Sequence, residues 1–214
     1  MQTAALFDLD GVVIDTEGQY SQFWKGVGEQ DFPDNPDFAA SIKGHTLTQI
    51  LAEYYPNDAA AQQRVIGVLN DFEQNMDFPY IAGAVEFIQS LRKAGIPTAV
   101  VTSSNNDKMQ CLYRLHPELP ALFDHIFTAE NARRSKPAPD CYIDAAQHFG
   151  LEAKACFVFE DSISGLHAGL DSGATVVGLT TTNPIDVVRP LCHYVMDNFQ
   201  GFSVEKMLEL KNER

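Results

Sequence analysis

Two carboxylates stand two residues apart near the start of the chain, in the segment A-A-L-F-D-L-D-G at residues 4–11. Asp8 and Asp10 close a short apolar run, and Gly11 follows at once. Residues at i and i+2 of a strand share a face, so a strand that ends near Asp8 brings both carboxylates to its carboxyl end. Carboxylates that close repel each other unless a cation lies between them. The pair therefore indicates either a cation site or an acidic turn, and for a lone D-x-D motif the turn is the commoner case.

Polar residues that suit the same chemistry follow three other apolar runs. Thr102 to Asn106 follow the run P-T-A-V-V. Lys136 lies in the loop after the run at residues 123–128, and Glu160 and Asp161 follow C-F-V-F. Because ligands of parallel α/β sheets bind at the carboxyl ends of the strands, this recurrence favours one shared site.

The segments between these residues alternate between two patterns. Short apolar runs predict strands at residues 3–8, 97–102, 123–128, 155–159, 175–179 and 193–196. Apolar residues at helical spacing predict helices at residues 83–94, 107–115, 139–149, 163–171 and 204–210. Apolar strands that alternate with helices are typical of a parallel sheet covered on both faces. The predicted fold class is therefore α/β.

Residues 15–80 differ from the rest of the chain because they carry helical patterns alone. Apolar residues recur at helical spacing after Thr16, from Leu47 to Tyr54 and from Ala59 to Asn75. A stretch with two prolines at residues 31–37 reads as a loop. This region is expected to be all-helical.

Composition excludes several classes of partner. The chain has 214 residues, of which 45% are hydrophobic, so it can bury a substantial core. Its net charge of −14 disfavours general binding to nucleic acid or to an anionic membrane, since both need a basic face. A small anionic ligand remains compatible with this charge, because a metal ion and a few local cations can reverse the field inside one cleft.

The cysteines and the N-terminus indicate the compartment. The four cysteines are widely spaced and form no C-x-x-C motif, which favours free thiols in a reducing cytosol. The N-terminus shows neither the basic segment nor the long apolar segment of a secretory signal, and no apolar run reaches the length of a membrane span. A cytoplasmic protein without nucleic-acid or membrane partners is expected.

Four motifs in order along the chain give it a resemblance to a known family. They are D-L-D-G-V at residues 8–12, V-V-T-S-S-N at 100–105, S-K-P-A-P-D at 135–140 and F-E-D-S-I-S-G at 159–165. Together they resemble the signature motifs of the haloacid dehalogenase superfamily, in its branch of helical-cap phosphatases and β-phosphoglucomutase-like enzymes. The resemblance covers nearly the whole chain. It implies a Rossmann-like parallel-sheet core at residues 1–14 and 81–214, with an inserted α-helical cap domain at residues 15–80.

The resemblance implies a role for each carboxylate of the first motif. Asp8 would be the nucleophile that attacks phosphorus, and Asp10 the general acid and base. An aspartate at position 10 favours phosphoryl transfer over dehalogenation, because dehalogenases of this superfamily lack the acid there and need no metal.

The other motifs would complete the catalytic and metal sites. The metal ligands implied for Mg²⁺ are Asp8, the backbone carbonyl of Asp10, Asp161 and Glu160. Lys136 would pair with Asp8 and the phosphate, and Thr102 would donate a hydrogen bond to the phosphoryl oxygens. The alternative for residues 160–162 is a helix cap provided by Ser162, which is compatible with a metal ligand at Asp161.

Candidate substrate-binding residues lie in the cap and after the second strand. They are Thr16, Lys43, Gly44, His45, Ser103 and Asn106. Residues 43–45 resemble the substrate-specificity loop of the branch, although a surface lysine is an equally good reading of Lys43 by itself. Asn106 is as well explained by helix capping as by phosphate binding.

The expected function is Mg²⁺-dependent hydrolysis of a small phosphate monoester, such as a sugar phosphate, through an aspartyl-phosphate on Asp8. A hexose phosphate mutase of the β-phosphoglucomutase type is the first alternative. Tyr20, where many branch members carry histidine, and the lack of an arginine shortly after Gly44 both weaken that alternative. Less favoured alternatives are a non-catalytic phosphate-binding protein and a haloacid dehalogenase. A monomer is expected.

Overall fold

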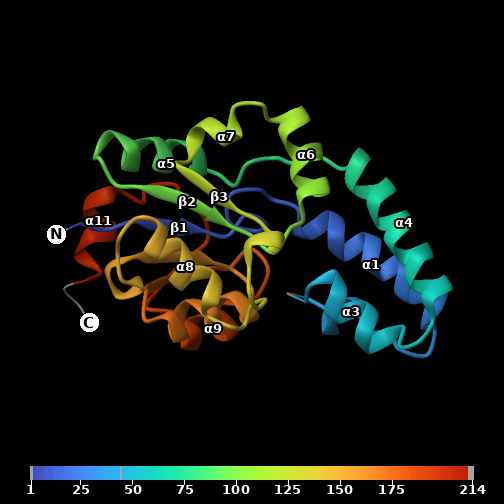
Figure 1. Cartoon of the computed structure of the whole chain (residues 1–214). Helices are drawn as coiled ribbons and strands as arrows, with labels where there is room; N and C mark the ends of the chain where they lie inside the picture. Colours follow the sequence, from blue (N-terminus) through green and yellow to red (C-terminus); the bar gives the residue numbers. More distant parts are fainter. Residues whose placement is uncertain (1, 44, 212–214) are drawn as a thin grey trace.

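A six-stranded sheet forms the centre of the larger part of the molecule (Figure 1). The computed structural model describes residues 2–43 and 45–211. The strand order is β3-β2-β1-β4-β5-β6, and every neighbouring pair is parallel. The strands are β1 Ala5–Phe7, β2 Thr98–Val101, β3 His125–Phe127, β4 Phe157–Glu160, β5 Thr175–Leu179 and β6 Tyr194–Met196. The prediction of an α/β fold with a parallel sheet is confirmed.

Strand β1 occupies the middle of the sheet, and its register fixes where the functional residues fall. Phe7 pairs with Val100 of β2 on one side and with Phe159 of β4 on the other. The carboxyl ends of these three strands therefore lie side by side. The residues that follow each strand emerge at one edge of the sheet, as the recurrence of polar residues predicted.

Helices cover both faces of the sheet. One face presents Phe7 and Phe159, which pack in one apolar cluster with residues of α5 and α11. The other face presents Leu6 and Val158, which pack with residues of α8 and α9. These helices and their neighbours in this part are α5 Ala84–Lys93, α6 Asn106–Leu115, α7 Leu119–Leu122, α8 Asp140–His148, α9 Ile163–Ser172, α10 Ile185–Val188 and α11 Val204–Glu209, with short 3₁₀ helices at Ala129–Asn131, Ala153–Ala155 and Arg189–Leu191.

Between β1 and α5 the chain forms a separate group of helices beside the sheet (Figure 1). These are α1 Glu17–Asp31, α2 Phe38–Ser41, α3 Leu47–Tyr54 and α4 Ala59–Asn75. They bury an apolar cluster of their own around Trp24, Phe38 and Val65. We call this group the helical insertion; the division of the chain into domains at residues 15 and 80 stays a prediction.

The two segments that join the helical insertion to the sheet run side by side. Ile14 forms an antiparallel bridge with Tyr80. The Asp15 N–H donates to the carbonyl of Pro79 at 2.8 Å, and the Ile81 N–H donates to the carbonyl of Val13 at 2.9 Å. The insertion is thus attached through one narrow, hydrogen-bonded neck.

The α-helices that the sequence did not predict are the shortest ones. Helices α2, α7 and α10 have four residues each, which is one turn and too few to show a period of 3.6 residues. No helix among the described residues is long and apolar enough to cross a membrane. All four cysteines are free, and Cys141 and Cys156 are buried as expected.

Candidate active site

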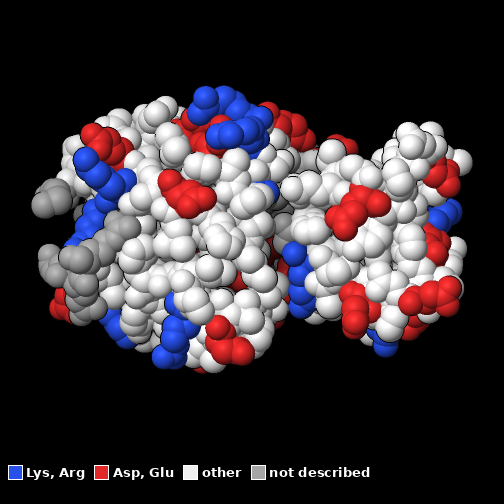
Figure 2. Space-filling model, turned by 90° about the horizontal axis from the view of Figure 1, so that it is seen from below, with Lys and Arg blue, Asp and Glu red and all other residues white. Residues whose placement is uncertain are grey.

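Residues from several strand ends line one cavity of about 400 Å³ between the sheet and the helical insertion. Asp8 follows β1, Thr102 follows β2, and Asp161 follows β4, while Lys136 comes from the loop between β3 and α8. Figure 2 shows a furrow between the two parts of the molecule, with acidic side chains inside it. The four separate sequence motifs therefore meet in space.

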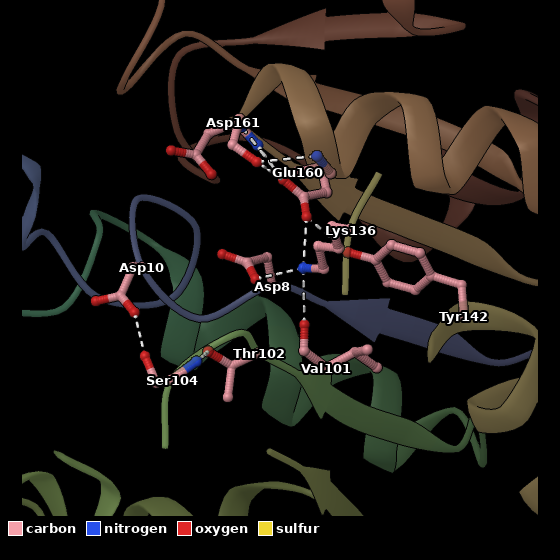
Figure 3. A network of polar contacts seen from close by, with 11 residues as sticks. Asp8, Asp10, Val101, Thr102, Ser104, Lys136, Tyr142, Glu160 and Asp161 are labelled. Atoms are coloured by element: carbon pink, nitrogen blue, oxygen red, sulfur yellow. Dashed lines mark hydrogen bonds and ion pairs between the residues drawn. The ribbon is translucent and has the colours of Figure 1, made fainter. Parts of the chain in front are cut away.

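Lys136 is the buried cation at the centre of this site (Figure 3). Its Nζ donates to Asp8 Oδ1 at 2.6 Å, to Glu160 Oε1 at 2.6 Å and to the carbonyl of Val101 at 3.0 Å. Burial alone would lower the pKa of Lys136, but the charges of Asp8 and Glu160 outweigh it and raise that pKa well above its usual value. The ammonium group is therefore charged, and it points at the Asp8 carboxylate.

The carboxylates around Lys136 carry more negative charge than one lysine balances. Burial, and then the charge of Glu160, raise the pKa of Asp8 to about 7, although Lys136 opposes the shift. The pKa of Asp161 is raised well above its usual value, first by burial and then by the charges of Glu160 and Asp8. A further positive charge would relieve this repulsion.

Mg²⁺ fits this set of residues. Carboxylate oxygens of Asp8, Glu160 and Asp161 lie within 4.8 Å of one another, and Mg²⁺ prefers oxygen ligands. Asp161 Oδ1 is buried and accepts no hydrogen bond, which leaves a lone pair for a cation. The other oxygen, Oδ2, accepts a hydrogen bond from the Thr182 hydroxyl.

Glu160 differs from the other two carboxylates because both of its oxygens are already engaged. Oε1 accepts from Lys136 and, at 2.8 Å, from the Tyr142 hydroxyl. Oε2 accepts from the N–H of Asp161 at 3.0 Å, and from both the N–H and the hydroxyl of Ser162, at 3.2 and 3.1 Å. These contacts suit a group that orients Lys136, and they leave Asp8 and Asp161 as the better candidates for direct metal ligands.

Asp10 lies in the same cavity but turns toward a different set of donors. Its Oδ1 accepts from the Thr16 hydroxyl at 2.5 Å and from Lys108 Nζ at 2.6 Å, and its Oδ2 accepts from the Ser104 hydroxyl at 2.8 Å. Figure 3 shows the Asp10 carboxylate beside Ser104, away from the Lys136 ammonium that Asp8 contacts. Burial alone would raise the pKa of Asp10. The charge of Lys108 and the hydrogen bonds from Lys108, Thr16 and Ser104 outweigh burial and lower that pKa.

Gly11 makes the turn after the two aspartates possible. Its φ of +73° lies in the left-handed region that favours glycine. A Cβ at this position would also overlap the carboxylate of Asp161 and crowd the Thr182 hydroxyl. Glycine at position 11 therefore lets the loop after β1 pass close to Asp161, the candidate metal ligand that follows β4.

The loop after β2 offers hydrogen-bond donors to the cavity. Thr102 Oγ1 accepts from the N–H of Ser104 at 3.0 Å, which leaves the threonine hydroxyl free to donate to a phosphoryl oxygen. Ser103 and Asn105 also line the cavity, and Asn105 caps α6 by accepting from the N–H of Lys108. Asn106 does not line it: this residue is the first of α6, its side chain is exposed, and its N–H donates to Glu130. Asn105 is therefore the residue that caps α6, and the structure does not bring Asn106 to the lining of the cavity; binding of the substrate by Asn106 stays a prediction.

The residues that were predicted to bind substrate from the cap differ in whether they line the cavity. Lys43 and His45 line the cavity, and Lys43 Nζ approaches the carbonyl of Thr182 at 3.4 Å. Thr16 is fully buried against Asp10 and is not among the lining residues. Gly44 lies outside the described residues.

Several residues of the site were given no role in it by the sequence analysis. They are Glu17, Tyr20 and Glu73 from the helical insertion, Ser104 and Lys108 near the start of α6, and Thr182 after β5. The run T-T-T-N at residues 180–183 follows a predicted strand and carries the same signal as the other strand ends. Lys108 gives no such signal, since a lysine in a helix is normally exposed.

Comparisons with known proteins show what the whole chain is similar to. A family model described as haloacid dehalogenase-like hydrolase matches residues 5–179. Hexitol phosphatase A of Escherichia coli is 31% identical over 189 residues, which cover 86% of this chain and 85% of that protein. Beta-phosphoglucomutase of Mycobacterium bovis is 27% identical over 213 residues, and the match covers 84% of this chain and 81% of that protein. The crystal structure of a HAD hydrolase of family IA, variant 3, from Entamoeba histolytica matches with a TM-score of 0.84 and 26% identity, covering 99% of this chain and all of that one.

Proposed function

The chain belongs to the haloacid dehalogenase-like hydrolase family, and on that premise we propose that it hydrolyses a small phosphate monoester with Asp8 as the nucleophile. The observation that carries this proposal is the contact of 2.6 Å between Lys136 Nζ and Asp8 Oδ1 in a buried site. A carboxylate attacks a phosphoryl group only when the repulsion between the two is cancelled. Lys136 is held where its positive charge offsets the negative charges of both Asp8 and the phosphoryl group.

The reaction would run in two steps on this chain's own residues. Asp8 attacks phosphorus, the bond to the leaving oxygen breaks, and Asp10 donates a proton to that oxygen. Asp10 must enter this step as the carboxylic acid, against the lowering of its pKa by Lys108. In the second step Asp10 takes a proton from water, which attacks the aspartyl-phosphate and releases inorganic phosphate. The hydroxyl of Thr102 and the ammonium of Lys136 stabilise the charge on the phosphoryl oxygens.

Asp8 and Asp161 would hold Mg²⁺, and Glu160 would fix Lys136 beside them. When bound, the ion supplies positive charge that neutralises the phosphoryl group and the crowded carboxylates. The buried Asp161 Oδ1, which has no hydrogen-bond partner, supports this assignment.

The cations of the cavity favour a phosphatase over a mutase. A mutase has to hold a bisphosphate by its second phosphate, which needs a second anion site. Among the described residues that line the cavity there is no arginine. Two of its lysines, Lys108 and Lys136, each lie 2.6 Å from a carboxylate, which leaves Lys43 as the lysine without a carboxylate contact.

The wall of the cavity indicates the kind of leaving group. The helical insertion contributes apolar side chains, including Trp24, Ile50 and Leu69, next to the carboxyl groups of Glu17 and Glu73. Such a wall suits an uncharged leaving group with hydroxyls and a nonpolar face, as a sugar or polyol has. A volume of about 400 Å³ holds a small metabolite.

A panel of sugar, polyol, nucleotide and cofactor phosphates with Mg²⁺ tests this function, with release of inorganic phosphate as the readout. We expect the wild-type protein to hydrolyse sugar or polyol monophosphates and Asp8→Asn to lose at least 1,000-fold in rate. A folded Asp8→Asn variant with the wild-type rate would refute the mechanism. A hexose 1-phosphate with its bisphosphate separates the alternatives, since a mutase yields the isomer and a phosphatase yields phosphate.

A further inference from the structure

Lys108 is a buried lysine that none of the four motifs contains. It lies in the first turn of α6, and its residue exposure is 4%. Burying an ammonium group is costly unless a carboxylate pairs with it, so a buried lysine marks a position where a charge is needed. The carboxylate that Lys108 contacts is Asp10, at 2.6 Å.

The helical insertion covers Lys108 from the opposite side. The Nζ of Lys108 lies 4.5 Å from the centre of the Tyr20 ring, a distance at which a cation interacts with the face of an aromatic ring. The Tyr20 hydroxyl in turn donates to Glu73 Oε1 at 2.7 Å. Residues of α1 and α4 thus hold the Lys108 ammonium in place against Asp10.

The contacts of Asp10 differ in strength. All three donors bond to the same carboxylate, but Thr16 and Ser104 are uncharged hydroxyls, whereas the Lys108 ammonium adds the attraction between opposite charges in a buried site. Lys108 is therefore the dominant contact that decides where the Asp10 carboxylate stands. Lys136 does not replace it, because Lys136 is paired with Asp8 and Glu160.

From these contacts we infer that Lys108 is a positioning residue: it fixes the place of the Asp10 carboxyl group, from which the protonated acid transfers its proton to the leaving group, and Tyr20 and Glu73 hold Lys108 there from the helical insertion. This inference rests on the proposed function, in which Asp10 is the general acid. Two other roles for Lys108 make different predictions. A lysine that binds the substrate phosphate would affect all substrates alike, and a purely structural lysine would affect only the amount of active protein.

The test compares two substrates that need the acid to different degrees. The leaving group of p-nitrophenyl phosphate departs as a stabilised anion and needs little protonation, whereas the alkoxide of a polyol phosphate needs a proton in the transition state. The ratio of kcat/KM for the polyol phosphate to kcat/KM for the aryl phosphate therefore reports on the acid. Because both values come from one preparation, the active fraction cancels in the ratio.

We expect Lys108→Met to lower this ratio by about 10- to 100-fold, part of the 10²- to 10⁴-fold that a general acid contributes. Lys108→Arg, which keeps the charge, should restore part of the ratio. A fall of fivefold or more in Lys108→Met supports the inference, and any smaller fall overturns it. If Lys108→Met yields no folded protein, Lys108→Gln, which keeps a donor without the charge, carries the same comparison under the same threshold.

Three further variants calibrate the result. Asp10→Asn gives the full effect of losing the acid, and if its ratio does not change, the role of Asp10 in the proposed function fails rather than that of Lys108. Lys43→Met removes another lysine of the same cavity and should shift both substrates by a similar factor. Lys25→Met, on the exposed face of α1, should leave both values unchanged.

Discussion

At the scale of single residues, the site is a cluster of three buried carboxylates and one buried lysine. Lys136 contacts Asp8 and Glu160, Asp161 lies near these two carboxylates, and the exposure of each of the four residues is 8% or less. Such a group is under electrostatic strain until a divalent cation or a neutralising substitution relieves it. Stability measurements can detect that strain without any substrate.

Replacing Asp8 by Asn should stabilise the metal-free protein at alkaline pH. The pKa of Asp8 is about 7 in the fold, against an ordinary value of 3.8, so the folded state holds the proton more tightly than the unfolded state. The stability that this proton provides is complete below pH 4 and is lost as the pH rises through 7. The Asn side chain stays neutral throughout, so we expect a gain of about 1–3 kcal/mol at pH 8 that shrinks on acidification.

Denaturant unfolding with a chelator at several pH values measures this gain. Asp71→Asn, at an exposed position on α4, controls for the general effect of removing one negative charge from an acidic protein. A stability difference between wild type and Asp8→Asn that does not vary with pH would contradict the raised pKa.

Replacing Asp161 should weaken the binding of Mg²⁺ more than the binding of the substrate. Its Oδ1 is the buried oxygen without a hydrogen bond, so it is free for a cation. We expect Asp161→Asn to raise the Mg²⁺ concentration for half-maximal activity by 10-fold or more. The stabilisation of the protein by Mg²⁺ in thermal unfolding should also shrink. Unchanged Mg²⁺ titrations in both assays would remove Asp161 from the metal site.

At the scale of elements, the site depends on how closely the strand-end loops approach one another. The loop after β1 passes the loop after β4 so closely that only a glycine fits at position 11. The turn is tied further by the Gly11 N–H, which donates to the carbonyl of Ile14 at 2.7 Å, and by the Thr181 hydroxyl, which donates to the carbonyl of Gly11 at 2.5 Å. Two features therefore favour glycine at position 11: the positive φ of its backbone and the lack of room for a Cβ beside Asp161.

Gly11→Ala and Gly95→Ala separate these two effects. Both glycines have positive φ, +73° and +71°, but a Cβ at Gly95 meets no atom within 4 Å, whereas one at Gly11 overlaps Asp161. Each substitution should cost about 1–2 kcal/mol of stability for the backbone conformation alone. We expect Gly11→Ala to cost more than Gly95→Ala in chemical denaturation and to impair the Mg²⁺ dependence of activity as well. Equal costs and intact activity in both variants would show that the contact with Asp161 is unimportant.

The elements also show where sequence patterns succeed. The predicted helix at residues 59–75 and the predicted strand at 175–179 have the observed bounds, because each has a clear period and clear terminal residues. Asp8, Thr102, Lys136 and Asp161 were placed together because they follow strands of one parallel sheet. The contacts among Lys108, Tyr20 and Glu73 were not predicted, because they join elements far apart in the sequence and no local pattern encodes them.

At the scale of the whole molecule, the cavity lies between two parts that are joined by one neck. The sheet supplies the catalytic candidates, and the helical insertion supplies most of the wall that a leaving group would contact. We therefore expect the sheet to carry most of the chemistry and the helical insertion most of the specificity. The expected monomer, of 23.7 kDa, stays a prediction that sedimentation equilibrium can check.

The central claim is that Asp8 carries the phosphoryl group during turnover, and acid-quenched phosphoenzyme tests it most directly. Excess enzyme is mixed with Mg²⁺ and a phosphate-labelled monoester that it hydrolyses, quenched within the first turnover, and mapped by peptide mass spectrometry. We predict label on the side chain of Asp8 and none in Asp8→Asn. Label on a different residue, or release of phosphate by Asp8→Asn at the wild-type rate, would contradict the account.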